Sequence, residues 1–401
     1  MSNNFSLFSV YGIEAEYMIV DTSTLKVKAI ADLVLKELNN GVICNEVELG
    51  RVSWSNELVN HVLEIKCTEP EPILIGLDDL FHRSIKDVQQ ILTKWNCTLM
   101  PTSMNPWFNP EEETVLWPHD QREVYNLYNE IFNCKGHGWS NLQSVHINLP
   151  YKDENEFVLL HSAVRVILPL IPYFSASSPF FEGKKQKLAD NRLGFYEKNQ
   201  AKIPSIIGNI IPENIQSTKE YMNILEDVYK DISTFDHAKT LQHPWLNSRA
   251  AIPKFDVGAI EIRIMDIQES SYMDYVLVNF FVELIKFVLK ADKSSHNTGR
   301  FSDQYLRMVY DKSKEFDPKV DLANYFSLFG LKVDDGSFKE FRTKLIDQFT
   351  DKLDKKYHEG LKVIRNEGSL ANRLVKKELS TGLYTELIDC LTHNTFYTLN
   401  K

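Results

Sequence analysis

The feature that most constrains this chain is an apolar segment near its start in which carboxylates alternate with hydrophobic side chains. Residues 11–20 predict a β-strand with one face made of Tyr11, Ile13, Ala15, Tyr17 and Ile19. Glu14 and Glu16 then point together to the other face, roughly 7 Å apart. Like charges so placed repel each other, most strongly inside a protein, and a bound cation removes that repulsion. A solvated strand face is the alternative, but Met18 and Val20 make the rest of that face apolar.

A second segment, residues 259–265, repeats the alternation. One predicted face consists of Ile260, Ile262 and Ile264, and the other of Ala259, Glu261, Arg263 and Met265. A same-face ion pair is the structural alternative, and such a pair contributes little stability when it is exposed. The functional interpretation is a carboxylate and a guanidinium that face a bound ligand together.

A histidine enters the same pattern in residues 143–149. Val145, Ile147 and Leu149 predict the packed face, and Ser144, His146 and Asn148 point away from it. A lone histidine is more often structural than a ligand. His146 therefore gains a metal or phosphate role only in combination with the other strands.

Two further carboxylates lie in residues 56–66. Glu64 and Lys66 share a predicted strand face with Val62. Glu57 lies seven residues before Glu64, which puts the two on opposite faces of one continuous strand. Both reach one site only if the chain turns, bulges or is helical between them, and the sequence leaves that choice open.

Together these segments place up to five carboxylates and one imidazole on the polar faces of apolar strands. Oxygen-rich sites with an occasional nitrogen suit Mg²⁺ or Mn²⁺. The sequence contains no H-E-x-x-H motif and no cysteine cluster that would favour zinc. A cation such as Arg263 beside such a site suits a polyphosphate that is bridged by metal ions.

Composition excludes several other classes of function. The net charge of -10 and the lack of a long Lys/Arg block argue against a nucleic-acid partner. The five cysteines are odd in number and lack metal-ligand spacing, which predicts reduced thiols and a cytoplasmic location. The first residues show no signal-peptide pattern, and no run of about 18 apolar residues predicts a membrane span.

The order of predicted elements favours an α+β protein. Helical patterns cover 77–95, 122–132, 155–173, 218–232 and 272–290, and strands lie between them without a strict βαβ rhythm. No Rossmann or P-loop glycine motif occurs where such a site requires one. We expect a largely antiparallel sheet in a catalytic core at 1–291. After a polar break at 292–297, amphipathic patterns such as 338–362 predict a helical C-terminal part, 292–401, packed on the same domain.

At this point the motifs resemble those of glutamate–cysteine ligases and related carboxylate–amine ligases. The opening strand, Gly12-Ile-Glu-Ala-Glu16, resembles the family's G-x-E-x-E motif. Further resemblances follow in the family's order: Glu57 with Glu64, Ser144 to His146, Ser178 to Gly183 with Asp190 to Arg192, Asn247 to Ala250, and Gly258 to Arg263. A vaguer similarity lies at 368–373.

The resemblance implies a fold and a role for each matched residue. The family's fold is a glutamine synthetase-like funnel, a curved and mainly antiparallel sheet with helices packed outside. The implied metal ligands are Glu14, Glu16, Glu57, Glu64, His146 and Glu261. The implied catalytic residues are Arg263, at the transferring phosphoryl group, and Arg192, which would also bind the acidic substrate or its acyl phosphate. Arg249 would help to bind the substrate.

The implied function is ligation of L-glutamate to L-cysteine with ATP and Mg²⁺, giving γ-glutamylcysteine for glutathione biosynthesis. Phosphorylation activates the carboxylate as an acyl phosphate, which the amine then attacks. The implied partners are small molecules, namely ATP and amino acids, and no nucleic-acid or membrane partner is expected. Whether the protein forms a homo-oligomer is left open. Walls of the cysteine pocket are expected at Trp107, Trp117 and Tyr196. The alternatives are a ligase for another acid or amine, a small-molecule phosphotransferase and a non-catalytic binding protein.

Overall fold

The computed structural model describes residues 5–295 and 298–399. Within these ranges an eight-stranded sheet follows the order β2-β3-β4-β1-β6-β10-β9, with β5 paired to the end of β1. All of its pairings are antiparallel, which confirms the predicted α+β class. The strands are β1 Gly12–Asp21, β2 Glu46–Leu49, β3 Val52–Asn56, β4 Val62–Cys67, β5 Cys97–Met100, β6 Ser144–Pro150, β9 Ala251–Lys254 and β10 Ala259–Asp266, with a separate hairpin of β7 Phe180–Phe181 and β8 Lys184–Lys185.

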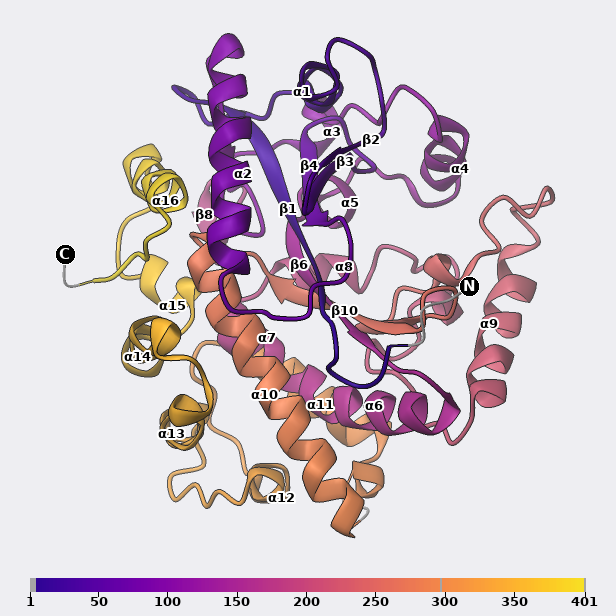
Figure 1. The fold of residues 1–401 in the computed structure, drawn as a ribbon, viewed down its shortest axis with the longest axis vertical. Coiled ribbons are helices and arrows are strands. Elements are labelled where there is room, and N and C mark those ends of the chain that lie inside the picture. The colour runs from indigo at the N-terminus through magenta and orange to yellow at the C-terminus, as the bar shows by residue number, and fades with distance from the viewer. Residues whose placement is uncertain (1–4, 296–297, 400–401) are drawn as a thin grey trace.

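Helices cover the apolar face of this sheet (Figure 1). Ile13 and Tyr17 of β1 share one hydrophobic core with Phe81 of α2 and Phe281 of α10, because the odd-numbered residues of β1 all point to that side. The helices are α1 Ala31–Leu38, α2 Leu77–Leu92, α3 Pro110–Glu113, α4 Arg122–Phe132, α5 His137–Ser140, α6 Glu154–Ile167, α7 Ile171–Ser175, α8 Arg192–Tyr196, α9 Thr218–Ile232, α10 Ser271–Ser295, α11 Asp303–Ser313, α12 Ala323–Phe326, α13 Phe338–Phe349, α14 His358–Glu367, α15 Leu370–Leu374 and α16 Thr381–His393.

The predicted helices are present, but two of them are divided. The pattern at 155–173 becomes α6, a 3-10 turn and α7, where Pro169 and Pro172 remove backbone donors. The pattern at 338–362 becomes α13 and α14, because Asp354 accepts a hydrogen bond from the Lys356 amide and starts a new turn. The polar break predicted at 292–297 is wrong as far as Ser295, where α10 continues, and residues 296 and 297 lie outside the described ranges.

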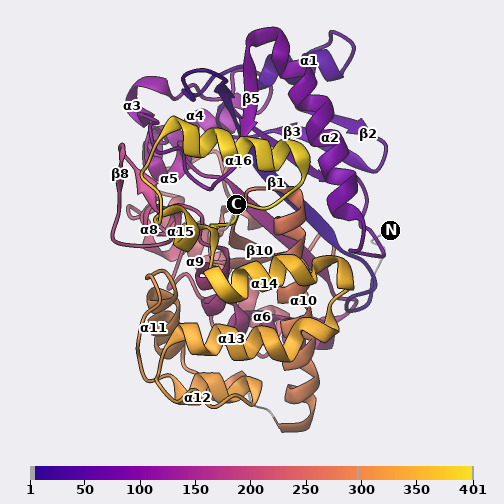
Figure 2. The same ribbon diagram turned by 90° about the vertical axis from the view of Figure 1, so that its left-hand side faces the viewer.

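The C-terminal helices build a second core on the other face of β1. Met18 and Val20, which share that face with Glu14 and Glu16, pack with Leu370 of α15. The same core continues into α16, and α13 and α14 stack on each other and on α10. Figure 2 shows α12 to α16 as a layer across one side of the molecule. We keep the division into a core at 1–291 and a helical part at 292–401 as a proposal.

One stretch, Glu154–Ser175, is long and apolar enough to pass a composition test for a membrane span, with a mean hydropathy of 1.7. However, 83% of that window is buried inside the protein. Helix α6 packs against α10 and β10, and α7 against β10. Its apolar character is therefore accounted for by the protein core.

Candidate active site

The antiparallel register brings the predicted carboxylates together around His146. Glu14 lies opposite His146 of β6, and Glu16 lies opposite Glu64 of β4. The Nδ1 atom of His146 is 3.2 Å from Glu14 Oε2 and 3.9 Å from Glu261 Oε1, and its Nε2 atom is 3.8 Å from Glu16 Oε1. We call Glu14, Glu16, Glu57, Glu64, His146 and Glu261 the carboxylate cluster.

Glu57 joins the cluster because the chain turns between β3 and β4. Ser55 of β3 pairs with Glu64 of β4, and its hydroxyl donates a hydrogen bond to Glu64 Oε1 at 3.0 Å. Glu57 follows Ser55 by two residues and continues the same face into the turn. Of the options that the sequence left open, the structure therefore has the turn.

Gly12 makes room for a residue that holds Glu14. The Nδ2 atom of Asn148 donates a hydrogen bond to Glu14 Oε1 at 2.9 Å. Asn148 lies opposite Gly12, and a Cβ atom at Gly12 would lie 3.1 Å from the Asn148 Cβ atom. A side chain at this position would push Asn148 away from Glu14, which gives the glycine of the motif a physical reason.

Two cavities flank the carboxylate cluster. The larger one, of about 520 Å³, contains the whole cluster together with Lys254 and Asp256. The smaller one, of about 280 Å³, contains Glu16, Glu57 and His146 and extends to Arg192. Arg263 and Trp245 line both cavities, as do Glu16, Glu57 and His146, so the two spaces adjoin at the carboxylate cluster.

The charges in the cluster are strongly coupled. Burial raises the pKa of Glu14, but the hydrogen bond with His146 and the charge of Lys254 outweigh it and hold that pKa well below its usual range. Burial and the charge of Glu14 raise the pKa of Glu64 to about 7. Burial and the charges of Glu64 and Glu16 raise the pKa of Glu57 well above its usual range. The cluster thus holds more carboxylates than its own cations neutralise.

Two sets of side chains in the cluster have the geometry to hold a metal ion. In each set, Glu14 with His146 and Glu261, or Glu16 with Glu64 and His146, the ligand atoms lie within 4.8 Å of one another. Carboxylate oxygens with one imidazole nitrogen fit a hard divalent ion. A neutral imidazole has one lone pair, so His146 can serve one of the two sets at a time.

Lys254 is a site residue that sequence reasoning missed. Its Nζ atom contacts Glu14 Oε1 at 3.2 Å and also Glu261, so it bridges two carboxylates of the cluster. Lys254 ends β9, the strand that pairs with β10 through a short turn. The short spacing before 259–265, with Gly258 in the turn, was the available signal for this hairpin.

A bulge in β10 overturns one predicted face. Ile262 pairs with Ile147, but Met265 pairs with Val145, so β10 contains one residue more than β6 over this stretch. Met265 therefore turns to the packed side, contrary to the prediction, and Asp266 turns to the side of Ser144. Without the bulge, Asp266 would lie on the face of Ile262.

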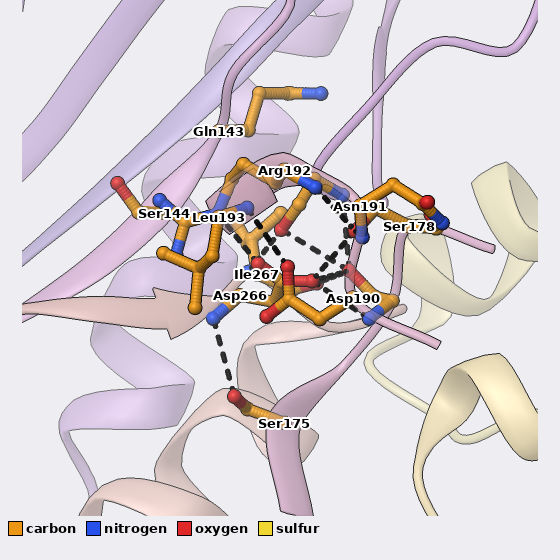
Figure 3. Close-up of polar contacts among 12 residues, drawn as sticks. Gln143, Ser144, Ser175, Ser178, Asp190, Asn191, Arg192, Leu193, Asp266 and Ile267 are labelled. Carbon is orange, nitrogen blue, oxygen red and sulfur yellow. Dashed lines mark hydrogen bonds and ion pairs between the residues drawn. The ribbon is translucent and has the colours of Figure 1, made fainter. Parts of the chain in front are cut away.

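Asp266 binds Arg192 in a second, fully buried group of charges (Figure 3). Arg192 Nε donates to Asp266 Oδ1 at 2.5 Å, and Asp266 Oδ2 accepts from the Ser177 amide at 2.8 Å. Asp190 lies in the loop just before Arg192, and burial and the charge of Asp266 raise its pKa well above its usual range. We call Asp190, Arg192 and Asp266 the aspartate–arginine cluster. Arg192 Nη2 is buried without a hydrogen-bond partner among the described residues, and Arg192 lines the smaller cavity.

The other two predicted arginines have different positions. Arg263 lies in the bulge with its Nε atom 3.0 Å from Glu261 Oε1, and it lines both cavities. Arg249 is buried and binds both oxygens of Glu213 and the carbonyl oxygen of Ser205, and it lines neither cavity. In this structure Arg249 therefore packs among the loops, and its role in substrate binding stays a prediction.

The predicted pocket walls are partly corrected. Tyr196 lines the smaller cavity, but Trp117 is buried in the main core and Trp107 packs on Tyr384 of α16. The remaining aromatic walls, which the sequence did not single out, come from Tyr125, Tyr128, Trp139 and Trp245.

Comparison with known proteins identifies the family. The model of glutamate–cysteine ligase family 2 matches residues 10–305, well over half of the chain. An uncharacterised protein of Archaeoglobus fulgidus is 31% identical over 96% of this chain and 99% of its own length. Two proteins provisionally named glutamate–cysteine ligase 2, from Bradyrhizobium sp. and Bdellovibrio bacteriovorus, are 26% and 22% identical over 60% and 65% of this chain.

These last two matches cover 56% and 61% of the relatives' own lengths. Among solved structures, the complex between the prokaryotic ubiquitin-like protein Pup and its ligase PafA is similar over 96% of this chain and 64% of that chain, with 10% identity and a TM-score of 0.38. The family match covers every strand that carries the carboxylate cluster. This chain belongs to glutamate–cysteine ligase family 2.

Proposed function

We propose that this enzyme, an ATP-dependent carboxylate–amine ligase by family, uses Mg²⁺ and activates the γ-carboxylate of L-glutamate as an acyl phosphate. The observation that carries the proposal is the convergence of five carboxylates and His146 between two cavities. Such a cluster suits metal ions that bridge the phosphates of ATP, and Mn²⁺ could replace Mg²⁺ there.

The residues of the cluster would hold the metal ions by their oxygens and by one nitrogen of His146. The bound ions would supply charge neutralisation for the transferring phosphoryl group. The larger cavity, which contains all the cluster residues, is the space that we assign to the triphosphate. Lys254 already bridges Glu14 and Glu261, and we expect it to turn toward phosphate oxygens when an ion replaces it between these carboxylates.

The arginines would act on the substrate side of the cluster. Arg263 lines both cavities and would face the phosphoryl group as it passes from ATP to the carboxylate. Arg192 would bind a carboxylate of the acid through its free Nη2 atom, with Asp266 fixing the orientation of the guanidinium. Water must be excluded from the site until the amine attacks, because water would hydrolyse the acyl phosphate.

The family's name supports L-glutamate as the acid and makes L-cysteine the first amine to test, with γ-glutamylcysteine as the product. The family also supports small molecules as partners, and we propose a cytoplasmic enzyme without a nucleic-acid or membrane partner.

The test is to incubate the purified enzyme with ATP, Mg²⁺, L-glutamate and a panel of amines, and to separate nucleotides and amides. We expect ADP and phosphate, released in proportion to an amide that forms only when an amine is present. If AMP and pyrophosphate were the products instead, the activated intermediate would be an adenylate and not an acyl phosphate. ADP release with a phosphorylated product and no amide would make the enzyme a phosphotransferase.

A further inference from the structure

The residues that line the smaller cavity include three buried side-chain atoms without a hydrogen-bond partner among the described residues. Two are guanidinium nitrogens, Arg192 Nη2 and Arg263 Nε, and the third is the amide oxygen of Gln200. Arg263 Nε lies 3.0 Å from Glu261 Oε1, which is a contact between charges without the angle of a hydrogen bond. A buried polar atom without a partner costs free energy, so three of them in one cavity wall indicate a bound ligand.

The surrounding hydrogen bonds decide which end of the Gln200 amide is free. Ser248 Oγ donates to the carbonyl oxygen of Leu246 at 3.2 Å, and a hydroxyl has one hydrogen to donate. Ser248 Oγ can therefore only accept from Gln200, and the amide atom 2.8 Å away from it is the nitrogen Nε2. The oxygen is the end without a partner, so the wall presents an acceptor at this place and not a donor.

Gln200 has a fixed position relative to Arg192. Its exposed fraction is 2%, and it lies shortly after α8, the helix that begins at Arg192. Tyr196 of that helix donates a hydrogen bond to the carbonyl oxygen of Ser248 at 2.9 Å, and the Ser248 amide donates to Ile206 at 2.9 Å. One wall of the cavity thus holds a cationic donor and a neutral acceptor in place before any substrate binds.

The three free atoms are complementary to L-glutamate. Its two carboxylates accept hydrogen bonds, as the guanidinium nitrogens require, and its α-ammonium group donates, as the Gln200 oxygen requires. The indole nitrogens of Trp139 and Trp245 in the wall are donors only, so they can add contacts to a carboxylate but not to an ammonium group. Glu16 and Glu57 also line the cavity, but they belong to the carboxylate cluster, which we assign to metal ions. The Gln200 oxygen is the buried acceptor that remains for the ammonium group.

We infer that Gln200 binds the α-ammonium group of the acid substrate and so selects an amino acid over a dicarboxylic acid without an amino group. The inference rests on the proposed function, in which Arg192 binds one carboxylate of the same molecule and Arg263 faces the other. Ser248 is a positioning residue, because it keeps the oxygen of Gln200 turned toward the ligand. The contact joins a charged donor to a neutral acceptor and adds no charge beside the metal ligands.

The test compares L-glutamate with glutarate, which has both carboxylates and lacks the ammonium group. kcat/KM is measured for each acid with ATP, Mg²⁺ and the amine that supports ligation. The wild type should favour L-glutamate by roughly 10–100-fold, the range for a hydrogen bond with a charged group. Gln200→Met keeps the length of the side chain and removes the acceptor, so it should bring this ratio to about one by weakening L-glutamate alone. Both rates come from one preparation, so any loss of folded enzyme cancels in the ratio.

Two further variants locate the effect. Ser248→Ala allows the Gln200 amide to rotate and should give a ratio between those of the wild type and Gln200→Met. The matched control is Val124→Ala, because Val124 lines the same cavity without a polar side-chain atom. It should change kcat/KM for both acids alike and keep the wild-type ratio. A wild-type ratio in Gln200→Met, or a rise in KM for the amine in place of the acid, overturns the inference.

Binding separates this inference from the proposed function. Calorimetry with Mg²⁺ and a non-hydrolysable ATP analogue should show weaker binding of L-glutamate to Gln200→Met than to the wild type, and unchanged binding of glutarate. This result supports the ammonium contact even if no amine gives an amide. Amide formation with an undiminished preference for L-glutamate in Gln200→Met would uphold the ligase and overturn the inference. Equal affinities of the wild type for the two acids would also overturn it.

Discussion

The carboxylate cluster and the aspartate–arginine cluster lie on the same face of one sheet, and they balance charge in opposite ways. In the first, five carboxylates share His146, Lys254 and neighbouring cations, and the pKa values of Glu57 and Glu64 rise. In the second, Arg192 is matched by Asp266 and the pKa of Asp190 is raised well above its usual range. A group with surplus negative charge is built for a ligand, whereas a balanced group holds the fold and orients one side chain.

The largest effect on stability is expected in the aspartate–arginine cluster. Asp266→Asn should lower the free energy of unfolding by about 3–5 kcal/mol, because it leaves the buried Arg192 guanidinium without its partner. Urea unfolding followed by circular dichroism measures it. Asp190→Asn should cost less, since the raised pKa favours the neutral form of Asp190. Equal losses for both variants would contradict this division of roles.

In the carboxylate cluster, a substitution should lower activity instead of stability. Glu16→Gln should reduce kcat/KM for ligation by roughly 10²–10³-fold, as expected for loss of one preorganised charge at the reacting phosphate. The variant removes repulsion with Glu57 and Glu64, so its stability should not fall. A steady-state assay beside urea unfolding checks both points. A normal rate would show that Glu16 is not a ligand of the metal site.

The pH dependence of metal binding sharpens the contrast further. The pKa of Glu64 in the metal-free protein is raised to about 7, so below pH 7 Mg²⁺ must displace a proton. Affinity should fall about fivefold between pH 7 and pH 6, and about tenfold per pH unit below that, as measured by calorimetry. Glu64→Gln should flatten this dependence, and a flat profile in the wild type would refute the role of Glu64.

The same pKa shift has a consequence for stability without metal. A protonated Glu64 stabilises the folded state fully below its ordinary pKa of 4.5, and this contribution is lost as the pH rises toward 7. Thermal unfolding should therefore show a larger stabilising effect of Mg²⁺ at pH 8 than at pH 6.

The smallest effect is expected where an ion pair faces water. Asp347 and Arg365 form a two-bonded pair at 2.6 and 2.8 Å, but the side chains are 53% and 37% exposed. Asp347→Asn should cost less than about 1 kcal/mol in urea unfolding. A loss as large as that of Asp266→Asn would show that burial does not decide the strength of these pairs.

The sequence alone determined the parts of the site that follow from local periodicity. Alternation along one strand fixes which side chains share a face, so Glu14 with Glu16, Glu64 and His146 were placed on polar faces before any contact was known. The helices α4 and α9 have the bounds that their apolar spacing predicts. These properties depend on neighbours in the chain, which the sequence displays.

Only the tertiary structure decided how those faces meet. The turn after β3 brings Glu57 beside Glu64, and one extra residue in β10 turns Asp266 toward Arg192. The β9–β10 hairpin brings Lys254 into the carboxylate cluster, and packing commits Arg249 to Glu213. The walls of the smaller cavity come from segments more than a hundred residues apart, from Tyr125 to Trp245. A bulge, a register and a shared cavity arise from contacts between distant segments, and no local periodicity encodes those.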